Sequence, residues 1–312
     1  MKKRPLHKKI RDHLFFLLLQ LIIMMLRLMP RRMAIGFMKS TGRLIFRLAG
    51  SERTRTIRQL TMALGKEKTA SEIEAIACRV FMHFAAISVD FVRLPDIIRQ
   101  GINTLIDTQG MEHLDKAMAE GKGVIMITGH FGNWELLGAW LAQNGYPLKV
   151  VGTSLDDPRL DALVVRNRNA AGYTNIARGK GTREIIRTLR QGHVIGMLID
   201  QDTEVQSLFV NFFGRPAYTP TGAAVLARKL NVPIIPIFMP MNEDLTYSIE
   251  CGAPLDLQQT ENEEEDILTN TQRCTDVIEE MIRRSPSQWV WMHKRWHKQP
   301  ADNSDGYVLK EI

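Results

Sequence analysis

An α/β fold, with a mixed and mostly parallel sheet flanked by helices, is the fold class that the sequence predicts. From about Gly110 onwards, short apolar and β-branched runs alternate with segments in which apolar residues recur at helical spacing. Such alternation is typical of a sheet that is covered by helices on both faces. The 312 residues are 45% hydrophobic and 24% charged, which is an ordinary composition for a globular protein.

Three consecutive parts are expected along the chain. Residues 1–32 hold a basic flank and a membrane-anchor helix, residues 33–100 hold a helical region, and residues 101–312 hold the α/β domain. Within the helical region, Ser71 and Glu74 have the spacing of a capping box at the start of a long helix.

The expected anchor is the apolar segment 14–26, which only Gln20 interrupts. It follows residues 1–11, which hold six Lys and Arg residues. Thirteen helical residues at about 1.5 Å each cover roughly 20 Å, less than the roughly 30 Å of a bilayer's hydrocarbon core. We expect an uncleaved anchor that either spans the membrane, with its charged ends at the two membrane surfaces, or lies partly embedded in the membrane. A buried core helix is the alternative.

The net charge of +7 raises the question of a nucleic-acid partner. Residues 1–60 carry 15 basic and two acidic residues, whereas the remainder carries 26 basic and 32 acidic ones. Basicity confined to the N-terminal part, beside an apolar segment, suits an anionic membrane surface. No nucleic-acid-binding motif of the usual kinds is present, so no nucleic-acid partner is expected.

The α/β part is expected to alternate strands and helices. Strands are expected at 123–128, 147–153, 175–179, 194–202, 232–238 and 247–257, and helices at 134–145, 157–172, 182–192, 222–231 and 261–282. Ligands of such sheets bind beyond the carboxyl ends of the strands. His130, Arg178 and the pair Asp200 and Asp202 all fall near expected strand ends.

His130 is expected in the turn between a buried strand and the helix that Asn133 and Trp134 open. Glu135 follows five residues later, a spacing that separates two side chains around a regular helix. If His130 precedes the helix, the Glu135 carboxylate can accept a hydrogen bond from one imidazole nitrogen and raise the basicity of the other. The alternative is a capping or core histidine beside a solvated first-turn acid.

The residues around His130 carry a resemblance to a known family. TGHFGNWE at 128–135, preceded by GKGVI, resembles the H-x4-D/E signature of the lipid A biosynthesis (late) acyltransferases of the lauroyl and myristoyl transferase type. That family lies within the glycerolipid acyltransferase-like superfamily. The segments 177–202, 209–238 and 282–300 resemble the later blocks of the family in the same order, so the resemblance spans nearly the whole chain.

The resemblance implies a membrane-associated enzyme that moves a fatty acyl chain from acyl-carrier protein, or acyl-CoA, to a hydroxyl of a lipid A precursor. It also implies an N-terminal membrane helix, location at the inner membrane and a catalytic domain on the cytoplasmic side. No cofactor is implied. His130 would be the general base and Glu135 its orienting partner. No serine or cysteine has the context of an activated nucleophile, so we expect direct attack without an acyl-enzyme.

Further residues are expected to bind substrate. Arg178, in ARGKG, resembles the family's Arg-Gly element and suits a phosphate or the thioester oxyanion. Asp200 and Asp202 close an apolar strand, where unpaired acids are costly, so we expect them to hold Arg178 or bind the sugar. Asn133 and Arg166 complete the expected set. A surface arginine at a turn, for Arg178, and a solvated helix end, for Arg166, are the alternatives.

Other functions stay open from the sequence. An acyltransferase of the same fold could act on another glycolipid, aminolipid or secondary-metabolite acceptor, and an inactive membrane-bound scaffold would retain the same fold. A metal-dependent hydrolase fits worst, because H-x4-E lacks the second histidine of zinc sites. Cys78, Cys251 and Cys274 lie far apart and have no metal or redox spacing. No metal is expected.

Overall fold

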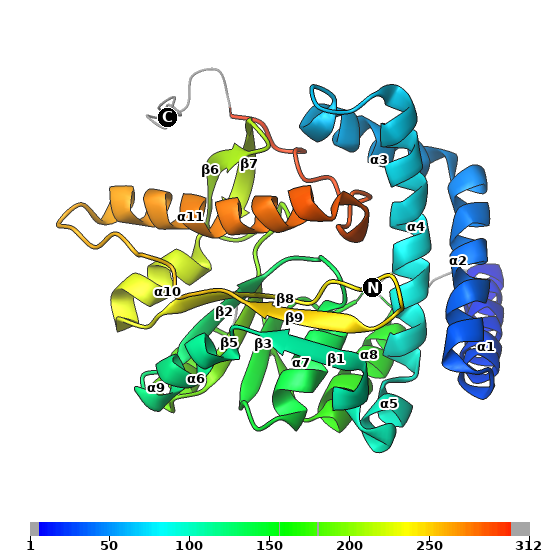
Figure 1. Cartoon of the computed structure of the whole chain (residues 1–312), viewed down its shortest axis with the longest axis horizontal. Coiled ribbons are helices and arrows are strands. Elements are labelled where there is room, and N and C mark those ends of the chain that lie inside the picture. The colour runs from blue at the N-terminus through cyan, green and yellow to red at the C-terminus, as the bar shows by residue number, and fades with distance from the viewer. Residues whose placement is uncertain (1–5, 156, 180, 301–312) are drawn as a thin grey trace.

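The computed structural model describes residues 6–155, 157–179 and 181–300, without the side chains of residues 6–12 and 15. Most of the basic flank expected at 1–11 therefore lies outside the described residues. The described chain forms a large sheet with helices on both faces and a separate helical layer at one side (Figure 1).

The main sheet has seven strands, and all but one of its neighbouring pairs are parallel. Across the sheet the strands are β1 (Ile106–Gln109), β9 (Tyr247–Cys251), β8 (Ile234–Phe238), β2 (Val124–Thr128), β5 (Val194–Leu198), β3 (Leu148–Gly152) and β4 (Thr174–Ala177). Only β8 and β9 run antiparallel. The predicted mixed, mostly parallel α/β fold is confirmed.

The helices of the α/β part cover the two faces of this sheet. They are α6 (Met111–Ala119), α7 (Trp134–Gln143), α8 (Pro158–Ala171), α9 (Thr182–Arg190), α10 (Gly222–Leu230) and α11 (Glu263–Arg284). Successive residues of β2 point to opposite faces, so Ile125 and Ile127 pack with α9, α10 and α11 while Val124 and Met126 pack with α6 and α7. A hairpin of β6 (Ser207–Phe212) and β7 (Arg215–Pro220) packs beside α11.

Five helices precede the sheet. They are α1 (Leu6–Leu28), α2 (Arg31–Leu48), α3 (Gly50–Leu64), α4 (Ala70–Val92) and α5 (Leu94–Gln100). The expected capping box at the start of α4 exists, but two residues earlier, because Thr69 accepts from the Glu72 backbone N–H and Glu72 accepts from the Thr69 backbone N–H. The pair predicted from sequence, Ser71 with Glu74, was wrong.

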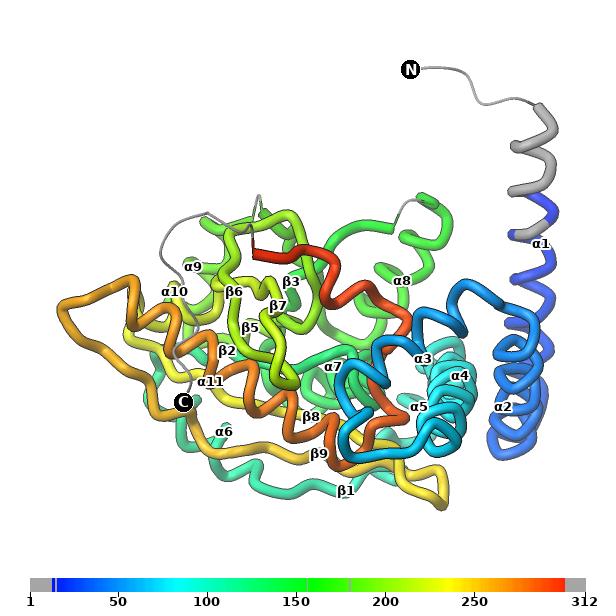
Figure 2. The backbone as a smooth tube through the Cα atoms, turned by 90° about the horizontal axis from the view of Figure 1, so that it is seen from above, coloured from blue at the N-terminus to red at the C-terminus, as the bar shows by residue number. Residues whose placement is uncertain are grey.

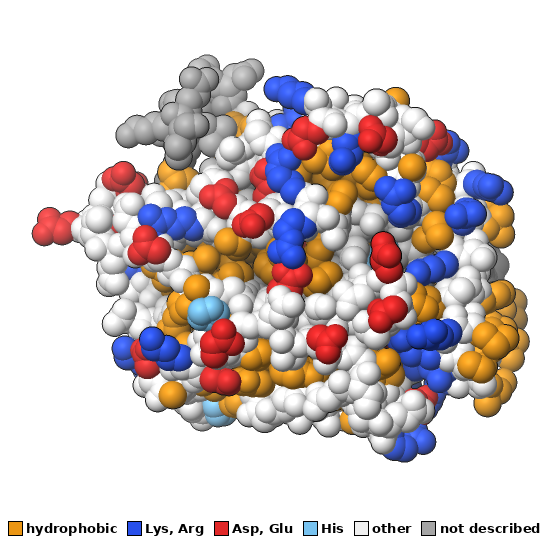
Figure 3. Space-filling view, viewed as in Figure 1, with side chains coloured by type: hydrophobic (Ala, Val, Ile, Leu, Met, Phe, Trp, Pro, Cys, Tyr) orange, Lys and Arg blue, Asp and Glu red, His pale blue; other side chains and the backbone are white. Residues whose placement is uncertain are grey.

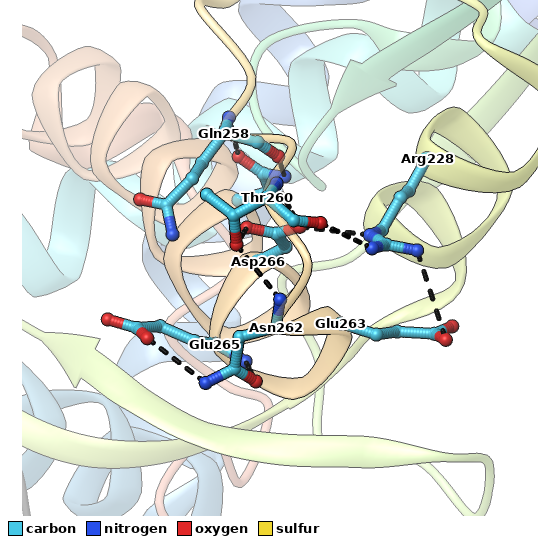
Figure 4. Close-up of polar contacts among 8 residues, drawn as sticks. Arg228, Gln258, Thr260, Asn262, Glu263, Glu265 and Asp266 are labelled. Carbon is cyan, nitrogen blue, oxygen red and sulfur yellow. Dashed lines mark hydrogen bonds and ion pairs between the residues drawn. The ribbon is translucent and has the colours of Figure 1, made fainter.

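Helix α11 begins where the acidic run predicted it. Asn262 caps the helix by accepting from the Glu265 N–H, and four acids occupy the first turn, where the helix dipole favours negative charge. Asp266 is buried and accepts hydrogen bonds from Arg228, on α10, and from the backbone N–H and hydroxyl of Thr260, as Figure 4 shows. These contacts hold α10 and α11 together at the end of the sheet remote from α1.

Apolar side chains are unusually exposed on α1 and α2. With the exception of Leu155, the exposed large hydrophobic residues of the described chain are Leu14, Leu17, Leu18, Leu21, Met24, Met25, Leu28, Met33, Phe37, Leu44, Ile45 and Leu48. They gather at the right-hand edge of the molecule in Figure 3, with Lys and Arg side chains beside them. Figure 2 shows α1 and α2 at the edge of the molecule opposite α9 and α10.

Among the described residues, one helix is long and apolar enough to cross a membrane by length and composition alone, and it is α4. Half of that segment is buried inside the protein, where it packs against α2 and α3. The apolar part of α1, Phe16–Leu28, is shorter.

A buried chain of polar side chains links the helical layer to the sheet. Arg31, the first residue of α2, donates two hydrogen bonds of 2.8 and 2.7 Å to the Asp90 carboxylate, which is fully buried on α4. The Tyr247 hydroxyl donates to the same carboxylate at 2.7 Å, and the Asn133 amide donates to that hydroxyl at 3.0 Å. Burial and the Asp90 charge raise the pKa of Tyr247 well above its ordinary value, so the hydroxyl keeps its proton.

Asp90→Ala is expected to destabilise the protein by about 3 to 5 kcal/mol, because it leaves the Arg31 guanidinium and the Tyr247 hydroxyl without their acceptor. Urea denaturation in nonionic detergent measures this loss. Glu74→Ala is the matched control, because Glu74 pairs with Arg53 at an exposed position and should cost less than about 1 kcal/mol. Equal losses in the two variants would contradict a stabilising role for the buried pair.

Candidate active site

The turn after β2 brings His130 to the carboxyl edge of the sheet, as predicted. Gly132 adopts φ of +58°, and a Cβ at this position would overlap the carbonyl oxygen of Met239 at the end of β8. A Cβ at Gly129 would approach the Asp200 carboxylate to 3.0 Å. These two glycines therefore let the turn fit closely between the ends of β8 and β5.

His130 is held by Asp200, which follows β5, the neighbour of β2 in the sheet. Its Nδ1 lies 2.8 Å from Asp200 Oδ1, and its backbone N–H donates to Oδ2 at 2.6 Å. The Trp289 indole N–H also donates to Oδ2, at 2.8 Å. The Asp200 side chain is fully buried, whereas that of His130 is 20% exposed.

These contacts keep the Asp200 carboxylate ionised near neutral pH. Burial alone would raise the pKa of Asp200, but the His130 charge and the hydrogen bonds from His130 and Trp289 outweigh it and lower the pKa to about 2. The ionised carboxylate accepts the Nδ1 proton of His130, which leaves the Nε2 lone pair available. No described residue hydrogen-bonds Nε2. The geometry is that of an oriented general base.

The expected hydrogen bond between His130 and Glu135 is not formed, and that prediction was wrong. Glu135 lies in the first turn of α7 and faces α8 and β4 instead of the turn. Its carboxylate accepts two hydrogen bonds from Arg168 in a bidentate contact, one from Nη2 and one from Nε at 2.9 Å. It also accepts from the Tyr173 hydroxyl at 2.9 Å. Asp200, which the sequence placed among substrate-binding residues, contacts His130 instead. A catalytic role for Glu135 stays a prediction.

Among the described residues, neither Asn133 nor Arg166 makes a hydrogen bond with the His130 side chain. Asn133 is 2% exposed, caps α7 by accepting from the Leu136 N–H, and donates to Tyr247. Both ends of its amide are therefore used inside the protein. Arg166 is exposed on α8 and makes no hydrogen bond or ion pair with the described residues, so its role in binding stays a prediction.

Arg178 follows β4 at the same carboxyl edge as His130 and Asp200. Its side chain is half-buried and makes no hydrogen bond with the described residues, although its backbone N–H donates to Gly152. Burial lowers the pKa of Arg178, and the charge of Asp200 acts in the opposite direction. A guanidinium with free donors near the general base is suited to an anionic group of a substrate. Asp202, by contrast, pairs with Lys298.

The C-terminal segment contributes side chains that the sequence did not place in the site. Trp289 and Trp291 are fully buried and pack in the core. His293 also lies in the electrostatic field of Asp200 and His130, and burial lowers its pKa to about 4. Gln59 of α3 positions this segment by donating to the carbonyl oxygens of Trp291 and His293. No local spacing pattern predicts these contacts.

Two of the three cysteines, Cys251 and Cys274, are unsuited to nucleophilic catalysis. Burial raises the pKa of Cys251 to about 11 and that of Cys274 to about 12, so both thiols stay protonated near neutral pH. Among the described residues, no group of three or more His, Cys, Asp or Glu side chains is arranged to hold a metal ion.

Comparison with known proteins agrees with the resemblance at the His130 turn. The family model described as bacterial lipid A biosynthesis acyltransferase matches residues 1–298. A phosphatidylinositol mannoside acyltransferase of Mycolicibacterium smegmatis is 25% identical over 285 residues, which cover 90% of each chain. The lipid A biosynthesis myristoyltransferase of Escherichia coli is 24% identical and covers 86% of this chain and 84% of its own. The lipid A biosynthesis acyltransferase of Haemophilus influenzae is 28% identical over 59% of this chain and 56% of its own.

Stability should depend on pH through Asp200. Its pKa falls from 3.8 to about 2 on folding, so its stabilising contribution is present above about pH 4 and is lost as pH falls towards 2. Between pH 5 and pH 3 the wild type should lose about 1 kcal/mol more than Asp200→Asn, which cannot titrate. Thermal or urea unfolding in detergent at both pH values measures the difference. An equal loss in both proteins would contradict the lowered pKa.

Proposed function

Because this chain belongs to the bacterial lipid A biosynthesis acyltransferase family, we propose that it transfers a fatty acyl chain from a thioester donor to a hydroxyl of a lipid A precursor at a membrane. The observation that carries the proposal is the His130–Asp200 pair, with Nε2 of His130 available at the carboxyl edge of the sheet. The acyl donor is acyl-carrier protein or acyl-CoA.

The reaction proceeds by direct attack. Nε2 of His130 takes the proton of the acceptor hydroxyl while its oxygen bonds to the thioester carbonyl carbon, and Asp200 stabilises the imidazolium that forms. The carbonyl oxygen becomes an oxyanion near Arg178, whose free donors stabilise it or bind a phosphate of the acceptor. The C–S bond then breaks, and the imidazolium returns its proton to the leaving thiolate. The protonated, buried thiols of Cys251 and Cys274 support a path without an acyl-enzyme.

Membrane association is supported by the exposed apolar surface of α1 and α2, since soluble monomers rarely expose large contiguous apolar patches. The guanidinium of Arg159 lies 4.7 Å from the centre of the Phe16 ring. Arg159 is the second residue of α8, the helix that follows β3 in the chain. The apolar part of α1 thus adjoins the same edge of the sheet as His130, where a membrane-borne acyl chain has the shortest path to the base.

We propose that α1 anchors the protein in the inner membrane with the catalytic domain on the cytoplasmic side, where soluble thioester donors are made. Fractionation of cells followed by protease treatment of intact spheroplasts tests this location. Protection of the chain from external protease, with release only by detergent, is the expected outcome. Recovery of the full chain in the soluble fraction would contradict it.

A second acceptor is favoured by one observation. The phosphatidylinositol mannoside acyltransferase of Mycolicibacterium smegmatis is 25% identical over 90% of this chain, which is as similar as the lipid A biosynthesis myristoyltransferase of Escherichia coli, at 24% over 86%. The same His130 geometry would serve a hydroxyl on another glycolipid. Incubation of the purified chain with labelled acyl donors and, separately, Kdo2-lipid IVA or a phosphatidylinositol mannoside distinguishes the acceptors. Mass spectrometry of lipid A from cells with and without the protein identifies the chain transferred.

The two carboxylates near His130 can be separated by kinetics. His130→Ala and Asp200→Asn should each lower kcat by about 100-fold to 10,000-fold, because both remove the oriented base. Glu135→Gln should have a smaller effect on kcat and act mainly on KM, since Glu135 holds Arg168 and not His130. Steady-state rates over a range of acceptor concentrations measure both kcat and KM. Near-normal activity of Asp200→Asn, with Glu135→Gln as damaged as His130→Ala, would overturn the assignment.

Arg178→Gln should lower kcat/KM by about 100-fold to 1,000-fold, because it removes a charged donor from the developing oxyanion or from a bound phosphate. Arg183→Gln removes an exposed arginine from α9 and is the matched control, with an expected change of less than about twofold. An effect confined to KM would indicate that Arg178 binds the substrate in the ground state. Equal effects of Arg178→Gln and Arg183→Gln would contradict a role for Arg178 in the site.

A further inference from the structure

A groove outside the His130 site runs between α1 and the junction of α4 with α5. Its cavity is about 530 Å³ and shares no lining residue with the His130 cluster. One wall is the C-terminal part of α1, with Met24, Arg27 and Leu28, and the floor holds Arg93 and Asp96. Ligand pockets in proteins commonly have volumes of about 300 to 1,000 Å³, so the groove is large enough for a ligand.

The floor of the groove carries a net positive charge. Asp96 accepts two hydrogen bonds from Arg27, at 2.9 and 3.0 Å, and one from Arg99, at 2.6 Å. Nη1 of Arg93 donates to three carbonyl oxygens at the end of α1, at 2.7 to 3.0 Å. Arg27 and Arg93 line the groove, and Arg99 lies directly beside it through its hydrogen bond to Asp96. Three guanidinium groups therefore surround one carboxylate, and the pKa of Asp96 is lowered, chiefly by its hydrogen bond from Arg27.

Several guanidinium donors remain available. Nη1 of Arg27, Nη2 of Arg93 and Nη1 of Arg99 have no hydrogen-bond partner within the described part of the chain. The Arg27 and Arg99 side chains are 41% and 73% exposed. Forked N–H donors of this kind suit the oxygens of a phosphate group, which they bind through charge-assisted hydrogen bonds.

The wall of the groove is apolar and open. Met24 is 54% exposed and Leu28 is 78% exposed, and they continue the exposed apolar face of α1 that begins at Leu14. A ligand in this groove meets cationic donors at one end and a long apolar surface at the other. That combination matches a molecule with an anionic headgroup and acyl chains, and it does not match a free phosphate ion.

We propose that this groove binds an anionic phospholipid, with its phosphate against Arg27, Arg93 and Arg99 and its acyl chains along α1. The inference rests on the membrane association in the proposed function. The bound lipid is not the acyl acceptor, because the groove contains no residue of the His130 cluster. By joining α1 to the junction of α4 and α5, the lipid would fix the angle at which the anchor leaves the protein body.

The test is a titration of the full chain in nonionic detergent with short-chain phosphatidylglycerol, short-chain phosphatidylcholine and glycerol 3-phosphate, followed by native mass spectrometry. Phosphatidylglycerol should saturate a single site and bind about tenfold more tightly than either of the other two. Equal affinity for the two lipids would show that the groove does not recognise an anionic headgroup and would overturn the proposal. Equal affinity for glycerol 3-phosphate would show that the apolar wall is not used and would overturn it as well.

Matched variants locate the site. Arg99→Gln should weaken phosphatidylglycerol binding about fivefold, and Met24→Ser with Leu28→Ser should weaken it without changing the affinity for glycerol 3-phosphate. Arg190→Gln makes the same change of charge on α9, at the opposite end of the molecule from α1 in Figures 1 and 2, and should have no effect. Equal losses for Arg99→Gln and Arg190→Gln would indicate diffuse charge attraction and overturn the proposal.

The acyltransferase assay on the same preparations separates the two proposals. A chain that transfers acyl groups but does not distinguish phosphatidylglycerol from phosphatidylcholine disproves the lipid site and leaves the proposed function intact. A chain that binds phosphatidylglycerol at the groove, with the expected loss in Arg99→Gln, but transfers no acyl group supports the site and counts against the proposed function.

Discussion

The buried carboxylate of Asp200 is the group on which the arrangement of the site depends. It receives hydrogen bonds from the backbone and imidazole of His130, 70 residues away, and from the Trp289 indole, 89 residues away. A carboxylate without these donors would be costly to bury in this position. The turn after β2, the end of β5 and the C-terminal segment must therefore come together before His130 is oriented. The hydrogen bond between His130 and Asp200, which helps to stabilise the charge of the carboxylate, also sets the tautomer of the imidazole.

Two other polar networks hold the helix that follows His130. On one side, Asn133 at the start of α7 is linked through Tyr247 to the buried pair of Asp90 and Arg31. On the other side, Glu135 binds Arg168 and Tyr173. The His130 turn is thus supported from the helical layer and from the far strands of the sheet at once. Preorganisation of this kind keeps a general base in position without reorganisation during the reaction.

The apolar part of α1 contacts the α/β part of the protein at the start of α8. α1 and α2 expose apolar side chains that few soluble proteins would tolerate, and α1 meets α8 beside the carboxyl edge of the sheet. The apolar part of α1 therefore reaches the carboxyl edge of the sheet that also carries His130. Arg178 adds a cation at that edge, close enough to Asp200 for the two charges to interact.

The sequence by itself determined the elements and the family. Apolar periodicity located the strands and helices, the glycines around His130 indicated its turn, and the motif with its later blocks indicated the acyltransferases. Local patterns succeed here because secondary structure depends on residues a few positions apart. Only the tertiary structure decided that Asp200 and not Glu135 binds His130, and that Trp289 completes the contact. Those partners are neighbours because β5 lies beside β2 and the C-terminal segment returns to the same edge, and strand order is not encoded in the spacing of either motif.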